Sequence, residues 1–98
     1  MKTLPDPLEF VWDPGNSGKN EQKHRVSDQE AEEPFFDEKK KIFTDRLHSG
    51  KEERFRIVGK TKILRVLFVV FTIRKRQIRI ISARDINKKE VHLYEKTA

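Results

Sequence analysis

The chain has 98 residues, enough for one domain, and it contains no cysteine, which excludes disulfides and thiolate metal sites. With 35% hydrophobic and 39% charged residues it can build only a small core, so we expect marginal stability or support from a partner. The longest apolar run, residues 66–71, is too short to span a bilayer, and the first residues lack the apolar stretch of a signal peptide, so we expect a cytoplasmic protein.

Charge is distributed unevenly along the chain, whose net charge is +6. Residues 1–49 carry 8 Lys or Arg and 11 Asp or Glu, a net charge of −3, whereas residues 50–98 carry 14 and 5, a net charge of +9. A basic half attracts polyanions, and nucleic acid is the first of these to consider. Charge that serves only solubility is the alternative.

The N-terminal region has few periodic signals. Residues 1–8 contain two prolines and are typical of a flexible leader, which leaves residues 9–98 as a single domain. Residues 9–12 have the composition of a short strand. Residues 14–23 favour a helix, because Asp13 can cap its free N–H groups and a proline suits its first position.

A second short helix is expected at residues 28–33, where Ser27 and Glu30 have the spacing of a capping box and Pro34 ends the helix. Strand patterns then dominate, at residues 42–44, 54–58, 64–72 and 77–83. Consecutive strands joined by short turns pair antiparallel. The sequence therefore predicts an α+β fold with helices on one face of an antiparallel sheet.

The connections near the end of the chain carry two further signals. Residues 73–76 fit a hairpin turn, although the Gly or Asn usual in such turns is missing. Asn87 and Glu90 have the spacing of a second capping box, which opens a final helix with Val91 and Tyr94 on one side.

The side chains available for chemistry are Arg, Lys, His and carboxylates. There is no glycine-rich phosphate loop, and His24, His48 and His92 lie too far apart for the spacing of metal ligands. Such a set suits RNA cleavage without a cofactor: cations stabilise the charge of the phosphorane, a His or Glu moves protons, and the RNA itself supplies the nucleophile. The residues on or beside the sheet that could contribute are Glu53, Arg54, Arg74, Arg79 and Arg84.

Strand parity tests which arginines can share a site. An arginine between isoleucines is costly to bury alone, so we expect Arg79 on an open concave face, with a buried carboxylate pair as the alternative. Arg84 has the parity of Ser82 and not of Arg79. Both arginines can therefore serve one site only if the strand ends or bulges near Ala83.

Simpler interpretations remain for several residues. Lys23 and His24 can be no more than a basic helix end, and His48 an ordinary loop residue. Trp12 fits the core better than a base-stacking platform. The basic residues 74–76 are most simply a solvated turn, although such a turn is well placed to grip phosphates.

Several segments together resemble the BrnT family of toxins. The N-terminal ones are Phe10-Val11-Trp12-Asp13-Pro14 and Lys19-Asn20-Glu21-Gln22-Lys23-His24-Arg25-Val26-Ser27. The closer ones are Asp45, His48-Ser49-Gly50-Lys51-Glu52-Glu53-Arg54, Ile57-Val58-Gly59, Leu67-Phe68-Val69-Val70-Phe71-Thr72, Ile78-Arg79-Ile80-Ile81-Ser82-Ala83-Arg84, and Glu90 with Tyr94. The likeness covers residues 9–95, nearly the whole chain.

The resemblance implies a function as well as a fold. BrnT proteins resemble metal-independent endoribonucleases with a RelE-like fold, which inhibit growth by cutting RNA and blocking translation. A cognate antitoxin, BrnA, neutralises them, and operator DNA is contacted only through that antitoxin. Two toxins and two antitoxins usually assemble together.

Chemistry and resemblance together give each candidate residue a role. Glu53 or His24 would act as base or acid, while Arg54, Arg79 and Arg84 would hold the phosphate. The expected RNA contacts are Lys23, Arg74, Arg76, Thr72 and Ser82, and no metal or other cofactor is expected. The alternative function is a basic module that binds nucleic acid or an acidic antitoxin without catalysis.

One departure from the family pattern concerns the turn after the first helix. Arg25 stands where the family usually has glycine. If that glycine adopts a positive φ, Arg25 is either strained there or the turn differs.

Overall fold

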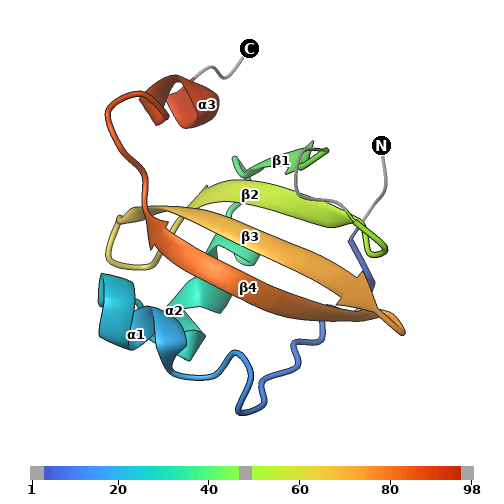
Figure 1. The fold of residues 1–98 in the computed structure, drawn as a ribbon. Helices are drawn as coiled ribbons and strands as arrows, with labels where there is room; N and C mark the ends of the chain where they lie inside the picture. The colour runs from blue at the N-terminus through green and yellow to red at the C-terminus, as the bar shows by residue number, and fades with distance from the viewer. Residues whose placement is uncertain (1–3, 47–49, 96–98) are drawn as a thin grey trace.

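The computed structural model describes residues 4–46 and 50–95. These residues form a four-stranded antiparallel sheet in the order β1-β2-β3-β4, with short helices beside it (Figure 1). The elements in chain order are α1 (Lys19–His24), α2 (Asp28–Glu32), the 3-10 helix η1 (Glu33–Phe36), β1 (Lys41–Thr44), β2 (Arg54–Lys60), β3 (Val66–Arg74), β4 (Gln77–Asp85) and α3 (Val91–Glu95). The α+β class and the antiparallel pairing of successive strands are confirmed.

The core lies on one face of the sheet, beneath α2 and η1. Alternate residues of β3, namely Leu67, Val69 and Phe71, point into it and are fully buried. Phe35 of η1 covers them and makes edge-to-face contacts with Phe10 and Phe71, with ring centroids 5.1 and 5.0 Å apart. The other buried members of this core are Val26, Ala31, Phe55, Ile57, Ile78, Ile80 and Ala83. Leu4, Leu8 and Trp12 also pack against it, so Trp12 belongs to the core as expected.

Two connections of the sheet have special backbone geometry. The hairpin between β3 and β4 is a two-residue turn in which Lys75 (φ 49°) and Arg76 (φ 67°) are both left-handed. This handedness matches the twist of the paired strands, so the turn forms without the expected glycine. Gly59 is required for another reason, since a Cβ there would come within 2.8 Å of Pro34 in η1.

The first helix begins five residues later than the sequence predicts. Asp13 caps a turn instead of a helix, because its carboxylate accepts the N–H of Gly15 at 2.8 Å. Gly18 then adopts a left-handed conformation (φ 75°), and α1 starts directly after it. The second cap is confirmed, since Ser27 Oγ accepts the N–H of Glu30 at 3.1 Å.

The outer edge of β4 is covered by the segment that precedes α2. The expected strand at residues 9–12 is reduced to a bridge, in which the N–H of Val11 donates to the carbonyl of Ile78 at 2.9 Å. Farther along the edge, the side chain of Asn16 donates to the carbonyl of Ile80 at 3.0 Å. The side chain of Asn20 then accepts the N–H of Ala83 at 3.0 Å. Polar groups that would otherwise stand unpaired at the sheet margin are therefore satisfied.

The turn after α1 keeps the geometry of a glycine turn. Arg25 is left-handed (φ 57°, ψ 38°), and its N–H reaches the carbonyls of Asn20 and Glu21. The turn is therefore unchanged and Arg25 carries the strain, the first of the two outcomes considered from the sequence.

The C-terminal helix α3 lies apart from α1 and α2 (Figure 1). Its capping box is confirmed, because the backbone N–H groups of Asn87 and Glu90 each donate to the other residue's side chain at 3.0 Å. Tyr94 donates its hydroxyl proton to Asp37 at 2.6 Å, which fastens α3 to the chain after η1. None of the helices in residues 4–46 and 50–95 is long and apolar enough to cross a membrane.

Candidate functional site

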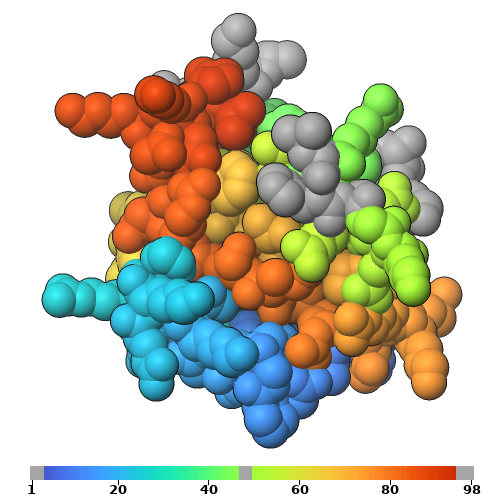
Figure 2. All heavy atoms as spheres, viewed as in Figure 1, coloured from blue at the N-terminus to red at the C-terminus, as the bar shows by residue number. Residues whose placement is uncertain are grey.

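A cavity of about 600 Å³, here called the hollow, opens on the sheet face opposite the core. Phe68 and Val70 of β3 form part of its floor, because they alternate with the core residues of that strand. In Figure 2, side chains of β3 and β4 in gold and orange lie between the red C-terminal segment and the yellow-green residues that follow position 50. The residues that line the hollow are Thr44, Asp45, Arg46, Arg54, Arg56, Phe68, Val70, Ile81, Ser82, Arg84 and Glu90.

A β-bulge in β4 brings its two arginines to this face. Val70 pairs with Ser82 and the next residue of β3 pairs with Ile80, so Ile81 is the extra residue. Below the bulge Arg79 pairs with Thr72, and above it Arg84 pairs with Phe68. Thr72, Val70 and Phe68 share one face of β3, and their partners share it too. Strand parity allowed Arg79 and Arg84 to share a face only if the strand bulged near Ala83. The bulge is present at Ile81, two residues before Ala83.

One row across the sheet joins Arg54, Thr72 and Arg79, which are direct neighbours on adjacent strands. The Thr72 hydroxyl donates to the carbonyl of Glu53 at 2.8 Å, and this holds the start of β2. Arg79 donates to a carboxylate oxygen of Asp13 at 2.5 Å, and its side chain is 17% exposed. This hydrogen bond from Arg79 keeps the pKa of Asp13 below its usual value. Arg79 therefore forms a partly buried pair with a carboxylate, the alternative considered from the sequence, and it is not among the residues that line the hollow.

Arg84 is held in a fixed orientation above the hollow. Its two terminal nitrogens donate to the two carboxylate oxygens of Glu90, at 2.8 and 2.7 Å. Its guanidinium carbon lies 4.5 Å from the centroid of the Phe68 ring. The hydrogen bond with Arg84 keeps the pKa of Glu90 below its usual value, so Glu90 is ionised at neutral pH.

Arg56 is a site residue that the sequence analysis did not select. It lines the hollow beside Arg54, and its guanidinium lies 5.9 Å from the centroid of the Phe68 ring. Its Nε is buried and has no hydrogen-bond partner within residues 4–46 and 50–95, which is a costly state for a polar group. The signal was present in the sequence, because Arg54 and Arg56 alternate on one face of a strand.

The comparison with known families identifies the fold that carries this hollow. A family model described as the ribonuclease toxin, BrnT, of type II toxin–antitoxin systems matches residues 12–90. The chain belongs to the BrnT family. The resemblance drawn from the sequence is therefore confirmed, and the BrnT match includes every residue that lines the hollow. No curated protein matches the chain. Membership makes the chain a ribonuclease toxin whose partner is an antitoxin.

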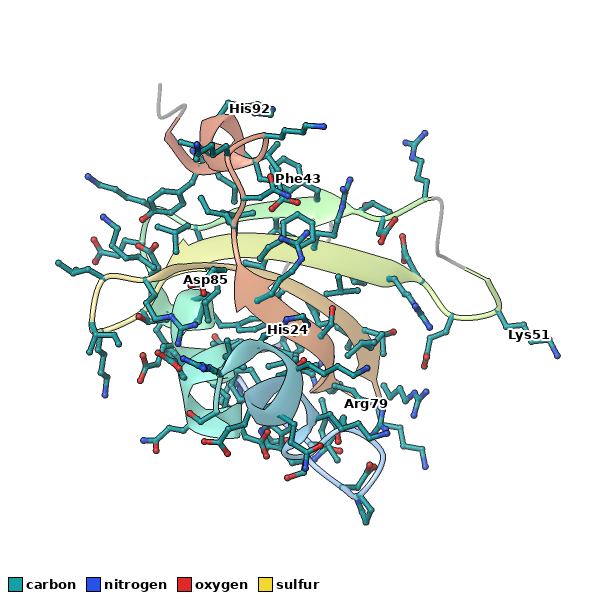
Figure 3. The ribbon with its side chains drawn as sticks, turned by 60° about the vertical axis from the view of Figure 1, so that its left-hand side comes forward. His24, Phe43, Lys51, Arg79, Asp85 and His92 are labelled. Carbon is teal, nitrogen blue, oxygen red and sulfur yellow. The ribbon has the colours of Figure 1, made fainter. Side chains whose placement is uncertain are left out.

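Two of the residues that sequence reasoning assigned to a BrnT site, Lys23 and His24, lie elsewhere in the structure. They belong to α1, which packs beside β4, and neither lines the hollow (Figure 3). Glu53 precedes Arg54 but does not line the cavity itself. The proton-transfer roles of Glu53 and His24 remain predictions. His48 lies outside the described residues.

The remaining basic candidates stand at the rim of the sheet. Arg74, at the end of β3, pairs with the carboxylate of Glu52, and its hydrogen bond lowers the pKa of Glu52. Arg76 lies in the exposed hairpin turn, 3.4 Å from the carbonyl of Asp6. Ser82 lines the hollow, whereas Thr72, which stands in the row between Arg54 and Arg79, is buried.

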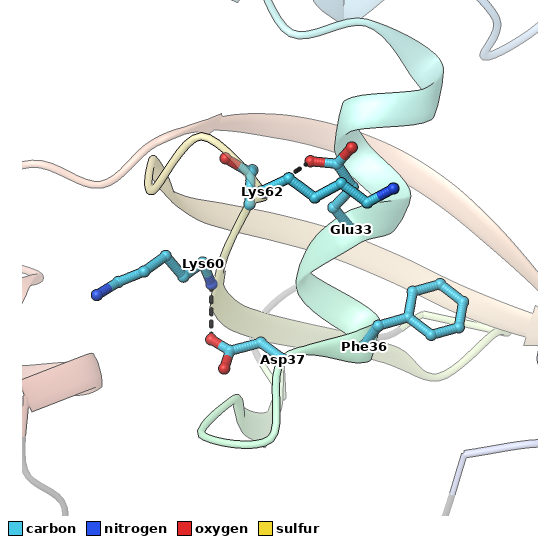
Figure 4. Close-up of a pocket in the computed structure, with 6 residues that line it drawn as sticks. Glu33, Phe36, Asp37, Lys60 and Lys62 are labelled. Atoms are coloured by element: carbon cyan, nitrogen blue, oxygen red, sulfur yellow. Dashed lines mark hydrogen bonds between the residues drawn. The ribbon is translucent and has the colours of Figure 1, made fainter.

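A second cavity of about 510 Å³ lies beside η1 and contains none of the predicted site residues (Figure 4). Its carboxylates are occupied, because Asp37 accepts the N–H of Lys60 at 2.8 Å and Glu33 accepts the N–H of Lys62 at 3.0 Å. Within residues 4–46 and 50–95, no three His, Cys, Asp or Glu side chains are grouped so that they could hold a metal ion.

Proposed function

We propose that this BrnT protein is an endoribonuclease that cuts RNA without a metal ion, through attack by the 2′-hydroxyl next to the scissile bond. In that reaction the 2′-oxygen bonds to phosphorus and the 5′-oxygen leaves. The products are a 2′,3′-cyclic phosphate and a 5′-hydroxyl. One group must accept the proton of the 2′-hydroxyl and another must protonate the leaving oxygen.

The observation that carries the proposal is the gathering of four arginines around the hollow. The cations of the lining are Arg46, Arg54, Arg56 and Arg84, against the two carboxylates of Asp45 and Glu90. Guanidinium groups in a partly enclosed site stabilise the charge that a phosphorane gains. The apolar side chains of Phe68 and Val70 between them offer a surface for a ribose or a base.

Each residue role follows from its place. Arg54 and Arg84 bind the scissile phosphate directly, and Arg79 supports the same row through Thr72. Ser82, which lines the hollow, orients a phosphate or ribose hydroxyl by hydrogen bonding. Glu53 is the better placed of the two proton-transfer candidates, because it adjoins Arg54 whereas His24 belongs to α1. Lys23, Arg74 and Arg76 extend the binding of RNA to flanking phosphates.

Neutralisation by a BrnA-type antitoxin belongs to the same proposal. The antitoxin prevents the toxin from blocking translation, and any contact with operator DNA is made by the antitoxin. Coexpression of the toxin with the antitoxin should restore growth that the toxin alone arrests, and the pair should copurify.

Purified protein incubated with RNA in the presence and absence of EDTA tests the activity. We expect cleavage that survives EDTA and yields cyclic phosphate ends. An RNA with methylated 2′-hydroxyls should bind but stay intact. Arg54→Ala and Arg84→Ala should each reduce cleavage about 100-fold, as expected for the loss of one group that stabilises transition-state charge.

Two results would overturn parts of the proposal. Loss of cleavage with EDTA would replace the metal-independent reaction by a metal-assisted one. Binding of unmodified RNA without any cleavage would instead establish the alternative, a basic module that holds nucleic acid.

A further inference from the structure

Glu90 occupies a position in the hollow that suits an anion. It accepts both parallel hydrogen bonds of the Arg84 fork, the geometry with which arginine also binds a phosphate. Arg56 attracts the same carboxylate electrostatically. Among the described residues, the buried Nε of Arg56 nevertheless lacks a hydrogen-bond partner, so Glu90 leaves this donor unsatisfied.

From this geometry we infer that the space between Arg84 and Arg56 is a phosphodiester subsite, which the carboxylate of Glu90 fills as an internal competitor until RNA displaces it. The inference rests on the proposed function and names both the subsite and its regulation. A phosphodiester carries two charged oxygens, each of which can accept more than one hydrogen bond, and unlike the Glu90 carboxylate it is not tethered to the chain. It can therefore move to bond to the Arg84 fork and to Arg56 Nε together.

The position of Glu90 in the chain allows this exchange. It lies in the connection between β4 and α3, and the α3 cap has two reciprocal bonds. If the carboxylate leaves Arg84, the bond from the Glu90 N–H to the Asn87 side chain remains. The helix therefore keeps one of its caps while the subsite opens.

Binding of a fully 2′-O-methylated RNA, which lacks the nucleophile, measures the competition directly. Glu90→Gln removes the competing charge and preserves the capping spacing. We expect it to tighten binding about tenfold. Glu30→Gln is the matched control, because it removes the same charge from Arg65, which neither lines the hollow nor has a proposed RNA contact. We expect that variant to change affinity less than twofold.

A double-mutant cycle shows whether the gain in RNA affinity depends on Arg84. In an Arg84→Ala background, Glu90→Gln should give no further gain. Three outcomes overturn the inference. Glu90→Gln could bind as weakly as Arg84→Ala, which would make Glu90 a positioning residue. Alternatively, Glu30→Gln could give the same gain in affinity, or the gain could persist without Arg84. Circular dichroism confirms that each variant is folded.

The inference and the proposed function can fail separately. If the wild type cleaves unmodified RNA and Glu90→Gln binds no more tightly, only the competition is refuted. If Glu90→Gln binds more tightly through Arg84 but no variant cleaves RNA, the subsite stands and the ribonuclease proposal falls. NMR of the Arg84 side-chain N–H in the wild type, titrated with inorganic pyrophosphate, is a second readout and should show a change at that signal. An unchanged signal at saturating pyrophosphate contradicts the subsite.

Discussion

Asp13, in the loop before α1, holds the guanidinium of Arg79 on β4, although the two residues are 66 positions apart. Arg79→Ala should therefore lower RNA cleavage about 100-fold, since it removes a cation from the row that includes Arg54. The fold should persist, because Arg79 is not part of the core. Cleavage assays with thermal unfolding measure both effects, and unchanged activity would remove Arg79 from the site.

Gly15→Ala tests the same relationship without removing a charge. A Cβ at Gly15 would lie 2.7 Å from a terminal nitrogen of Arg79, so the guanidinium has to move. We expect a loss of cleavage about tenfold, smaller than that of Arg79→Ala. Gly50→Ala is the control, because a Cβ there meets no atom of the described residues within 4 Å. Equal activity of the two alanine variants would show that the exact placement of Arg79 is unimportant.

The bulge at Ile81 allows Ile80 and Ala83 to face the core together, although they stand three positions apart in the chain. Deleting Ile81 leaves the two residues two positions apart, so both stay on the core face of a regular strand, and Arg79 and Arg84 stay together on the opposite face. We therefore expect the single deletion to unfold cooperatively. Deleting Ile81 and Ser82 together puts Ile80 and Ala83 on opposite faces, so one of them must leave the core and cooperative thermal unfolding should be lost. A single deletion that unfolds without cooperativity, or a double deletion that melts as the wild type does, would contradict this account of the register.

Sequence patterns captured the strands well because alternation and β-branched composition are local properties. They also predicted that Arg79 and Arg84 can share one face only if the strand bulges, because the two residues point to opposite faces of a regular strand. They could not locate the bulge, because its position depends on which residues of β4 the core accepts. The pairing of Arg84 with Glu90 was equally hidden, since it joins a strand to a loop and follows no period.

Sequence patterns misplace the end of a helix where a single residue changes the direction of the backbone. The first helix was placed too early because the left-handed conformation of Gly18 is a property of the folded turn. The packing of α3 away from the other helices also escaped prediction, since it depends on the contact of Tyr94 with Asp37. The lack of a partner for Arg56 Nε within the described residues could not be predicted either, because it depends on which side chains surround that atom in the fold.

Arg25→Gly should stabilise the protein. Arg25 has a left-handed backbone conformation that costs an L-residue about 1–2 kcal/mol and costs glycine almost nothing. Part of this gain is offset by the greater freedom of glycine in the unfolded chain, so we expect a net gain of about 1 kcal/mol in the free energy of unfolding. Arg25→Ala removes the side chain but keeps the strain, so it should show no such gain in urea denaturation. Equal stability of the two variants would locate the effect in the arginine side chain.

The single tyrosine gives a clean test of how α3 is attached at high pH. Burial and the hydrogen bond to Asp37 raise the pKa of Tyr94 to about 12. A pKa raised by folding means that the contribution to stability is complete below pH 10 and is lost as pH rises through about 12. Tyrosinate absorbance should titrate near pH 12 in the folded protein. Tyr94→Phe should lower stability at neutral pH and flatten its decline above pH 10; a titration near pH 10 would contradict the contact.

Residues 9–20 cover the outer edge of β4, so the two edges of the sheet differ in how accessible they are to another strand. Both backbone groups of Ile78, the carbonyl of Ile80 and the N–H of Ala83 are already bonded to residues 9–20, so an incoming strand from another molecule finds few vacant partners there. Among the described strands, the other margin is β1, which is four residues long and follows two lysines. Short length and repeated positive charge both discourage intermolecular pairing. The architecture therefore resists polymerisation from either side, by occupancy at one margin and by electrostatic repulsion at the other.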